Sequence, residues 1–329
     1  MSVAAPPTGA ALMEARDLAV HFRAHRRVAR ALDGVSLHWR RGEVLGVVGE
    51  SGCGKSTLAR ALLGLLSPAA GTVLRDGEPV EGRAALRELR RHVQMIFQDP
   101  YQTLNPRQRV SAIVAEPLRV QGVAEGEREA RVRRAMEDVG LDPARFLDRY
   151  PHQLSGGQRQ RVAIAAALVL EPEGLICDEP VSMLDVSVRA QILQVLIELQ
   201  RRRDLALLFI THDLSLAWSL CDRIAVMYLG RIVEQGSAVE VIERPQHPYT
   251  QALVGAVPVP TPGARVRAPL SGDLPDATNV PPGCRFHPRC PKRFEPCDSV
   301  DPPLLTTPVP GQVAACLLHD PQLTPDAVA

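Results

Sequence analysis

A glycine-rich segment near the N-terminus constrains the fold of this chain more than any other feature. Residues 49–57 read GESGCGKST, follow an apolar, β-branched stretch at residues 45–48, and overlap a helix-like pattern at residues 56–66. This is the phosphate-binding loop pattern G-x-x-x-x-G-K-S/T in its strand–loop–helix context. Glycines let backbone N–H groups wrap around phosphates, and the following helix adds the positive end of its dipole. The chain is therefore expected to bind a nucleotide.

The side chains of this loop have separate expected roles. Lys55 is expected to contact the β- and γ-phosphates, and the Ser56 hydroxyl to ligate Mg²⁺. Cys53 lies beside a helix N-terminus, where the pKa of a thiol tends to fall, so we expect bound ATP to protect it from a thiol reagent. The structural alternative is that Cys53 is only a small residue that fits the loop. The residues expected to line the phosphates are Gly49, Ser51, Gly52, Cys53, Gly54, Lys55, Ser56 and Thr57.

A second segment supplies carboxylates. Residues 174–179 read GLICDE, an apolar strand pattern that ends in two acidic residues. Asp178 is suited to hold the Mg²⁺ shell, and Glu179 to orient and polarise an attacking water. Acidic residues often end strands, but a phosphate loop about 120 residues earlier turns this weak pattern into a strong one.

Charge and hydrophobicity exclude some classes of function. The chain carries 38 basic and 37 acidic side chains, which gives no reason to expect a nucleic-acid surface. The longest apolar run, residues 162–170, is shorter than the roughly 20 residues of a membrane-spanning helix, and the N-terminus lacks a signal-peptide pattern. Any membrane role is therefore expected to come through a partner chain.

Strand-like and helix-like segments alternate along much of the chain. Strand patterns at residues 175–177 and 205–210 are each followed by a helix pattern, which favours a parallel sheet covered on both faces. Earlier in the chain, residues 127–139 combine many charges with apolar residues at helical spacing. This pattern predicts an exposed amphipathic helix in a helical insert.

The composition changes after residue 257. Fourteen of the 29 prolines lie between residues 258 and 310, which largely excludes regular helix or sheet there. A tail of this kind makes little core of its own and needs a staple to be ordered. The obvious staple is a cluster of four cysteines, Cys284, Cys290, Cys297 and Cys316. We therefore predict two domains, residues 1–257 and residues 258–329.

Four further motifs, in a fixed order along the chain, give a specific resemblance. Residues 154–160 read LSGGQRQ, in which Ser155 is suited to cap the helix that follows. Gln98 lies in the segment IFQDP, Asp185 in SMLD and His212 in ITHD. With the phosphate loop and the strand carboxylates, this set resembles the ABC ATPases, in which the four motifs are the signature, the Q-loop, the D-loop and the switch histidine.

The resemblance implies an α/β fold of the P-loop, RecA-like kind, with an antiparallel β subdomain and a helical signature subdomain at about residues 100–165. It implies ATP hydrolysis with Mg²⁺, which Ser56, Gln98 and Asp178 would hold. The signature helix would face the γ-phosphate bound in a second subunit, so a complete site would need two chains. The residues implied for catalysis are Lys55, Gln98, Glu179 and His212, and those implied to complete the partner's site are Ser155, Gly156, Gly157, Gln158 and Asp185.

The resemblance narrows to the oligopeptide/dipeptide importer branch. It is carried by the segments QDPYQTLNPR at 98–107, AEPL at 115–118, HPYTQAL at 247–253 and PGCRFHPRCP at 282–291. It implies a peripheral ATPase on the cytoplasmic face of the cell membrane, with two permease chains, an extracytoplasmic substrate-binding protein and a second ATPase that is similar but different. Relatives import peptides, nickel chelates, glutathione or sugars, so the substrate stays open, as does the identity of the second ATPase.

The four tail cysteines allow three interpretations. Some members of this branch carry an iron–sulfur cluster at such a tail, so a 4Fe-4S cluster on four thiolates is the leading hypothesis. Zinc is the alternative because four cysteines also make a closed tetrahedral site, although none of the spacings is the usual C-x2–4-C. His287 or His319 could replace a thiolate in either case, and buried thiols without a metal are the third reading.

Two departures from the family pattern matter. Met183 stands in the D-loop region where the family usually has alanine, which would alter packing at the dimer seam. The family also places an aromatic side chain against the adenine, but residues 23–30 contain none. Phe22 is the nearest aromatic residue but belongs to the first strand pattern, and His25 or an arginine is the alternative. The adenine-side residue therefore stays open.

Three other classes of protein fit the sequence less well. A soluble ABC protein acting on ribosomes usually carries two cassettes, whereas this chain has one. A DNA-repair ATPase of this family would show a long coiled-coil insert between Gly49 and Ser155, where no sustained heptads occur. A non-catalytic binding module would have lost Lys55, Glu179 or His212, and all three are present.

Overall fold

The computed structural model describes residues 10–24, 27–256 and 274–323. The chain forms two compact units, which we describe separately. The first unit comprises Met1–Trp39, Glu43–Pro79 and Phe209–Ala329, and the second comprises Arg40–Gly42 and Val80–Leu208. Strand β8 (Ala206–Thr211) contributes residues to both.

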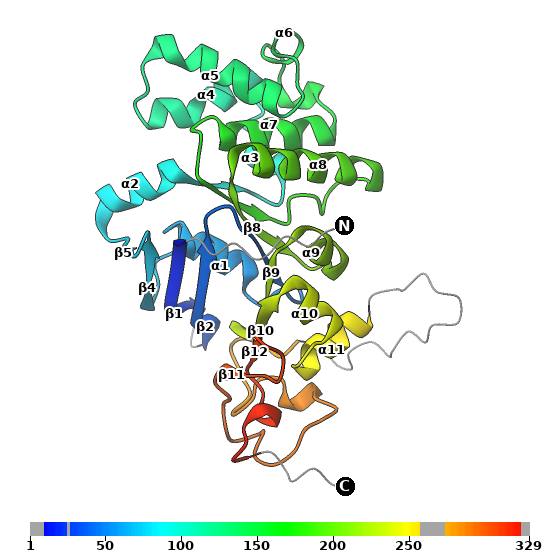
Figure 1. Cartoon of the computed structure of the whole chain (residues 1–329). Helices are drawn as coiled ribbons and strands as arrows, with labels where there is room; N and C mark the ends of the chain where they lie inside the picture. The colour runs from blue at the N-terminus through cyan, green and yellow to red at the C-terminus, as the bar shows by residue number, and fades with distance from the viewer. Residues whose placement is uncertain (1–9, 25–26, 257–273, 324–329) are drawn as a thin grey trace. The chain divides into compact units, whose positions relative to one another are not determined.

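One sheet of the first unit has four strands. They are β1 (Ala11–Ala24), β2 (Arg27–Arg40), β4 (Ala70–Arg75) and β5 (Glu78–Pro79). Their order is β2-β1-β4-β5, and β4 runs antiparallel to both β1 and β5 (Figure 1). Along β2 the buried side chains Val35, Leu37 and Trp39 alternate with more exposed ones, because successive side chains of a strand point to opposite faces. The expected antiparallel β subdomain is confirmed.

A second sheet of the first unit combines strands from both ends of the chain. They are β3 (Val44–Val48), β9 (Arg223–Tyr228), β10 (Arg231–Ser237), β11 (Leu305–Thr306) and β12 (Val313–Ala314), ordered β11-β12-β10-β9-β3 in this unit. β3 and β9 run parallel, with Leu45 opposite Arg223, and every residue of β3 is buried. Such a continuous apolar run suits a strand that is covered on both faces.

The helices of the first unit are short. They are α1 (Lys55–Leu62), α9 (Leu214–Leu220), α10 (Ala238–Glu243) and α11 (Pro248–Gly255), with 3-10 turns η2 (His287–Arg289) and η3 (Leu317–His319). α9 packs on β3, and α10 packs on α9 and β10. Within the part of the chain that the structure describes, no helix has both the length and the apolar character needed to span a bilayer.

The second unit is mostly helical. Its strands β6 (Val93–Ile96) and β7 (Gly174–Asp178) pair in parallel. Its helices are α2 (Gly82–His92), α3 (Pro100–Thr103), α4 (Val110–Val120), α5 (Glu125–Asp138), α6 (Pro143–Phe146), α7 (Gly156–Leu168) and α8 (Val186–Arg203), with the turn η1 (Pro151–Gln153). Helices α4, α5 and α7 pack against one another (Figure 1). Arg202 and Arg203 at the end of α8 pair with Asp138 at the end of α5, which ties two helix ends together.

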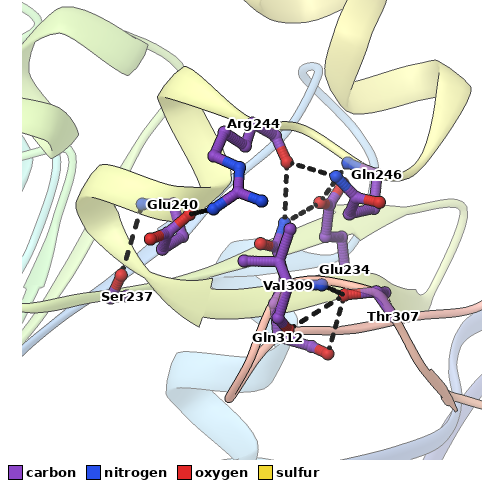
Figure 2. Close-up of polar contacts among 8 residues, drawn as sticks. All are labelled: Glu234, Ser237, Glu240, Arg244, Gln246, Thr307, Val309 and Gln312. Atoms are coloured by element: carbon purple, nitrogen blue, oxygen red, sulfur yellow. Dashed lines mark hydrogen bonds and ion pairs between the residues drawn. The ribbon is translucent and has the colours of Figure 1, made fainter.

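The tail is attached to the first unit through a buried carboxylate. Glu234 on β10 is fully buried and accepts a hydrogen bond from the backbone N–H group of Gln246 at 2.7 Å (Figure 2). It also accepts from the backbone N–H group of His247 at 2.9 Å. The amide of Gln312, a tail residue, donates to the same carboxylate and to the carbonyl oxygen of Arg244. Over residues 274–323, regular structure is limited to β11, β12 and the two 3-10 turns. The proline-rich tail therefore uses the core of the first unit instead of building its own.

Candidate functional site

The glycine-rich segment forms the loop between β3 and α1. Its last glycine, Gly54, is the N-cap of α1 in the left-handed conformation, and no side chain caps this helix. N–H groups at a helix start attract anions, because the helix dipole places partial positive charge there. The loop and helix therefore provide an anion site that is built from backbone.

Two glycines hold this loop against neighbouring backbone. A Cβ atom at Gly54 would lie 2.4 Å from the carbonyl oxygen of Ala31, and one at Gly49 would lie 2.2 Å from that of Met227. The φ angles of the two glycines are +111° and +155°, which other residues rarely adopt. Gly49 and Gly54 are thus required by backbone contacts that the sequence does not show.

The ammonium group of Lys55 lies over the same loop. Its Nζ donates hydrogen bonds to the carbonyl oxygens of Gly49 at 2.8 Å and Glu50 at 2.9 Å, and the residue is only 5% exposed. A buried cation beside an uncapped helix start suits a polyphosphate. This part of the structure therefore fits the nucleotide that the sequence motif predicts.

The two carboxylates of the second unit lie where β7 ends. Asp178, its last residue, is buried, and Glu179 follows with a φ of +46°. Few residues other than glycine adopt this left-handed conformation, which costs free energy and recurs at functional sites. The carbonyl oxygen of Glu179 accepts a hydrogen bond from the Ser182 hydroxyl at 3.1 Å, and this contact helps to hold the turn.

Gln98 and Glu179 are brought together by the fold of the second unit. The Gln98 amide Nε2 donates a hydrogen bond to Glu179 Oε2 at 3.2 Å across 81 residues of sequence. The parallel pairing of β6 with β7 puts their carboxyl ends at the same edge, with Ile96 opposite Cys177. Two residues predicted from separate motifs therefore meet in the structure.

Ser155 starts α7 with a reciprocal capping arrangement. Its hydroxyl accepts from the N–H of Gln158 at 3.3 Å, and the Gln158 side-chain oxygen accepts from the N–H of Ser155 at 3.0 Å. The predicted capping role of Ser155 is confirmed. A Cβ atom at Gly157 would lie 2.5 Å from Val188 Cγ1, so this glycine lets α7 approach α8 closely.

The D-loop segment presents apolar side chains to solvent. Asp185 is the N-cap residue of α8, although its side chain makes no capping hydrogen bond. Met183 is 59% exposed and Val186 is 81% exposed. An exposed methionine and valine beside a helix start are suited to contact another chain.

His212 belongs to the first unit, in the segment between β8 and α9. The residue is exposed, and the next residue, Asp213, caps α9 by accepting from the N–H groups of Ser215 at 2.9 Å and Leu216 at 3.4 Å. The predicted site residues are thus divided between the units. The first unit holds the phosphate loop and His212, and the second holds Gln98, Ser155, Asp178, Glu179 and Asp185.

The expected fall in the pKa of Cys53 is wrong, because its pKa is raised. Its thiol is only 1% exposed, and burial raises its pKa, although the nearby Lys55 acts in the opposite direction. Desolvation of the thiolate outweighs the attraction of the helix start, so Cys53 is a small buried residue of the loop. On the adenine side, Phe22 is 44% exposed on β1, whereas His25 lies outside the described residues.

The four tail cysteines lie near one another. Cys284, Cys297 and Cys316 are close enough to Cys290 for their thiolate charges to repel, and burial raises the pKa of Cys284 to about 12 and of Cys316 to about 11. The N–H of Cys284 donates to the carbonyl oxygen of Cys297 at 2.9 Å. Among the described residues, however, no three His, Cys, Asp or Glu side chains are arranged to hold a metal ion. The donor atoms fit a thiolate-bound metal, but their arrangement is not that of a formed site.

Two contacts near the phosphate loop were not anticipated from the sequence. Glu50, a variable position of the motif, accepts two hydrogen bonds from the guanidinium group of the tail residue Arg289. Its N–H also donates to the Tyr249 hydroxyl oxygen at 2.9 Å. The sequence showed only that Glu50 and Arg289 carry opposite charges and lie far apart in the chain. Many other pairs of residues share these properties, so this ion pair could not be predicted.

Comparisons with known proteins identify the family of this chain. The ABC transporter family model matches residues 32–182, and the model for the oligopeptide/dipeptide transporter C-terminal region matches residues 233–297. A peptide import ATP-binding protein of Brucella ovis is 46% identical over 93% of this chain and 97% of its own length. The dipeptide transport ATP-binding protein DppF of Escherichia coli K12 is 44% identical over 95% and 96%.

Solved structures show the same fold. CbiO1 of Clostridium perfringens, part of the ABC transporter complex cbiONQ, has a TM-score of 0.63 and 33% identity over 71% of this chain and 91% of its own. The ATP-binding cassette MJ0796, seen as a dimer bound to ADP and Pi, has a TM-score of 0.62 and 28% identity over 69% and 98%. The fold and site thus define an ABC-type ATPase, an enzyme that hydrolyses ATP. More narrowly, the chain belongs to the ATP-binding subunits of the oligopeptide/dipeptide ABC transporter family.

Proposed function

We propose that this chain energises the import of peptides across the cytoplasmic membrane by hydrolysing ATP. The observation that carries the proposal is the phosphate loop, in which the buried Lys55 lies over the uncapped start of α1. The names of the Brucella and Escherichia relatives support peptides as the transported solute. The tail region, which matches the oligopeptide/dipeptide model, supports the same solute class.

The proposed roles of the site residues follow from their chemistry. Lys55 and the backbone N–H groups of residues 49–57 bind the phosphates of ATP. Ser56, Gln98 and Asp178 would hold Mg²⁺, which would supply positive charge to offset the charge that develops in the reaction. Glu179 accepts a proton from the attacking water and His212 orients it. The hydrogen bond from Gln98 supports this role because it fixes the carboxylate of Glu179.

Hydrolysis is proposed to require two ATPase chains. The start of α7, with Ser155, Gly156, Gly157 and Gln158, would act on the γ-phosphate bound in the partner, while Asp185 lies at the seam. The dimeric state of MJ0796 and the exposed Met183 and Val186 support a pair. ATP favours closure because it binds the closed pair better than the open one, and product release allows reopening.

The other proposed partners are membrane chains. Two permease subunits would receive the ATPase pair on the cytoplasmic face, and an extracytoplasmic binding protein would deliver the solute. The chain would be peripheral, in keeping with the absence of a membrane-spanning helix among the described residues. The proposed organisation is an ATPase domain at residues 1–257, with its helical part at about residues 100–165, and a C-terminal extension at residues 258–329.

The tail cysteines are proposed to hold a 4Fe-4S cluster, with zinc as the alternative. The mutual proximity of Cys284, Cys290, Cys297 and Cys316 supports a shared ligand, which would staple a tail that has little core. Visible absorption, with iron, sulfide and zinc analysis of anaerobically purified protein, tests the idea. About four irons and four sulfides per chain support the cluster, zinc alone supports the alternative, and a colourless, metal-free, folded tail contradicts both.

The transport proposal is tested by isolating the chain with its membrane partners. A tagged chain is purified from gently solubilised membranes, and the co-purifying complex is placed in liposomes. ATP turnover should be stimulated by the substrate-binding protein loaded with di- or oligopeptides and abolished by Lys55→Ala. Stimulation only by a nickel chelate, glutathione or a sugar would contradict peptides, and recovery with soluble partners alone would contradict transport.

A further inference from the structure

An ion pair joins the tail to the phosphate loop within the first unit. Arg289 donates from one guanidinium nitrogen to Glu50 Oε2 at 2.8 Å and from the other to Glu50 Oε1 at 3.0 Å. The Arg289 side chain is only 6% exposed, and that of Glu50 is 27% exposed. A paired, bidentate geometry of this kind fixes both the position and the orientation of a carboxylate.

The position of Glu50 makes this pairing important. It directly follows Gly49, the first residue of the phosphate loop, and its carbonyl oxygen accepts from both Lys55 Nζ at 2.9 Å and the N–H of Cys53 at 3.3 Å. A carboxylate in a loop that binds polyphosphate repels the ligand unless a cation offsets its charge. Among the described residues, Arg289 forms an ion pair with the Glu50 carboxylate.

Arg289 belongs to a packed part of the tail. The residue ends the 3-10 turn η2, which lies between Cys284 and Cys290. Three residues earlier, Phe286 is 1% exposed and packs against Tyr228 and Tyr249, with ring centroids 5.3 Å and 5.4 Å apart.

Tyr249 makes a second contact with Glu50. Its hydroxyl oxygen accepts from the N–H of Glu50 at 2.9 Å, so Glu50 is held through its amide by α11 and through its carboxylate by the tail. The phosphate loop and the tail therefore share one packed cluster of aromatic and charged side chains.

We propose that Arg289 is a positioning residue of the nucleotide site, which masks the charge of Glu50 and fixes the phosphate loop so that ATP binds. The proposal rests on the proposed assignment of residues 49–57 as the ATP-binding loop. It makes the C-terminal extension part of the ATPase site, because the extension supplies the cation that pairs with the Glu50 carboxylate. Arg289 does not touch the nucleotide and acts through Glu50.

The test compares charge removal on both sides of the pair in the full-length chain. Arg289→Met should weaken binding of a fluorescent ATP analogue roughly tenfold, since it leaves the Glu50 carboxylate without this cation. Glu50→Gln alone should change affinity less than about threefold. The double variant should recover most of the affinity lost in Arg289→Met, because the repelling charge is also gone.

The matched control is a second buried arginine of the tail. Arg285 has the same 6% side-chain exposure but pairs with Asp33 and the carbonyl oxygen of Leu229 instead of with Glu50. Arg285→Met should lower the melting temperature like Arg289→Met but leave nucleotide affinity near that of the unaltered chain. Arg289→Lys, which keeps the charge and much of the packing, serves if Arg289→Met does not fold, and it should weaken binding by a smaller factor.

The results distinguish a failure of this proposal from a failure of the assignment of residues 49–57 as the ATP-binding loop. Equal affinity losses in Arg289→Met and Arg285→Met, or no recovery in the double variant, would mean that Arg289 only helps the tail to fold. Unchanged affinity in both Arg289→Met and Arg289→Lys would overturn the proposal directly. A Lys55→Ala variant that binds the analogue normally would instead overturn the assignment of the loop.

Discussion

Gln98 and Glu179 come from different motifs, yet the amide of one donates a 3.2 Å hydrogen bond to the carboxylate of the other. Glu179 is also held in a left-handed backbone conformation at the end of β7. The hydrogen bond and the strained backbone together restrict where the carboxylate can point. A general base benefits from such restriction, because proton transfer requires close alignment with the water.

Glu179→Gln is expected to separate binding from hydrolysis. The amide can still accept from Gln98 but is not a base, so ATP turnover in the assembled complex should fall ~10²–10⁴-fold while nucleotide affinity stays near normal. Turnover and equilibrium binding are measured on the same preparation. Glu198→Gln, on the exposed side of α8, is the control and should change neither. Near-normal turnover of Glu179→Gln would remove Glu179 from its proposed role.

Ser155→Ala is expected to lower both stability and activity. Loss of the cap on α7 should reduce the free energy of unfolding by about 0.5–2 kcal/mol, and hydrolysis should fall if this helix start acts on the partner's γ-phosphate. Denaturant unfolding and ATP turnover are the measurements. Ser237→Ala removes a similar cap from α10, where Ser237 accepts from Glu240 N–H at 3.2 Å, and should lower stability alone. Equal activity in the two variants would contradict the signature role.

Cys53 is expected to react slowly with thiol reagents whether or not ATP is present. Its burial and raised pKa keep it a thiol near neutral pH, and the thiolate is the reactive form. Alkylation at pH 7, followed by mass spectrometry of the peptide, should be at least about tenfold slower in the folded chain than in urea. Fast alkylation that ATP blocks would instead show that the Cys53 thiol is exposed and activated.

Stability should fall as the pH drops below the ordinary pKa of histidine, because of His247. Burial lowers its pKa from 6.5 to about 3, so between those values the unfolded chain binds a proton that the folded chain does not. The free energy of unfolding should therefore fall by up to about 1.4 kcal/mol per pH unit as the pH decreases through this window. Burial raises the pKa of the neighbouring Glu234, which acts in the opposite sense above pH 4.5.

His247→Asn isolates this contribution. The ring nitrogen Nδ1 of His247 accepts from the N–H of Tyr249 at 3.0 Å, and asparagine can cap α11 in the same way without titrating. Denaturant unfolding between pH 4.5 and 7.5 should show a shallower pH dependence in this variant. An unchanged slope would assign the acid sensitivity to other groups.

Much of the secondary structure followed from local patterns. Continuous apolar runs marked β3, β7 and β8 to within a residue or two, because strands buried on both faces need no polar side chains. The cap at Ser155 was also predictable, since a capping hydrogen bond spans only three residues. The motif spacing and the family resemblance were then sufficient for the enzyme class.

The tertiary structure decided where charges and thiols are buried. Whether Cys53 meets solvent or core sets the direction of its pKa shift, and Met227, far along the chain, is among the residues around its loop. The tail looked too small for a core, but Phe286 and Gln312 are accommodated by the core of the first unit. Neither the burial of Cys53 nor the packing of the tail can be predicted from the spacing of neighbouring residues.

The sequence by itself determined the phosphate loop, the order of the ATPase motifs and the family, because each motif is a run of neighbouring residues and the order of the motifs can be followed directly along the chain. Only the tertiary structure decided that Glu50 pairs with Arg289 and that Glu179 pairs with Gln98. Each of these pairs needs two distant segments brought within about 3 Å, at hydrogen-bond distance. Such a contact depends on the packing of the whole unit rather than on local preference, and the charges and donors involved had many other partners of the same kind.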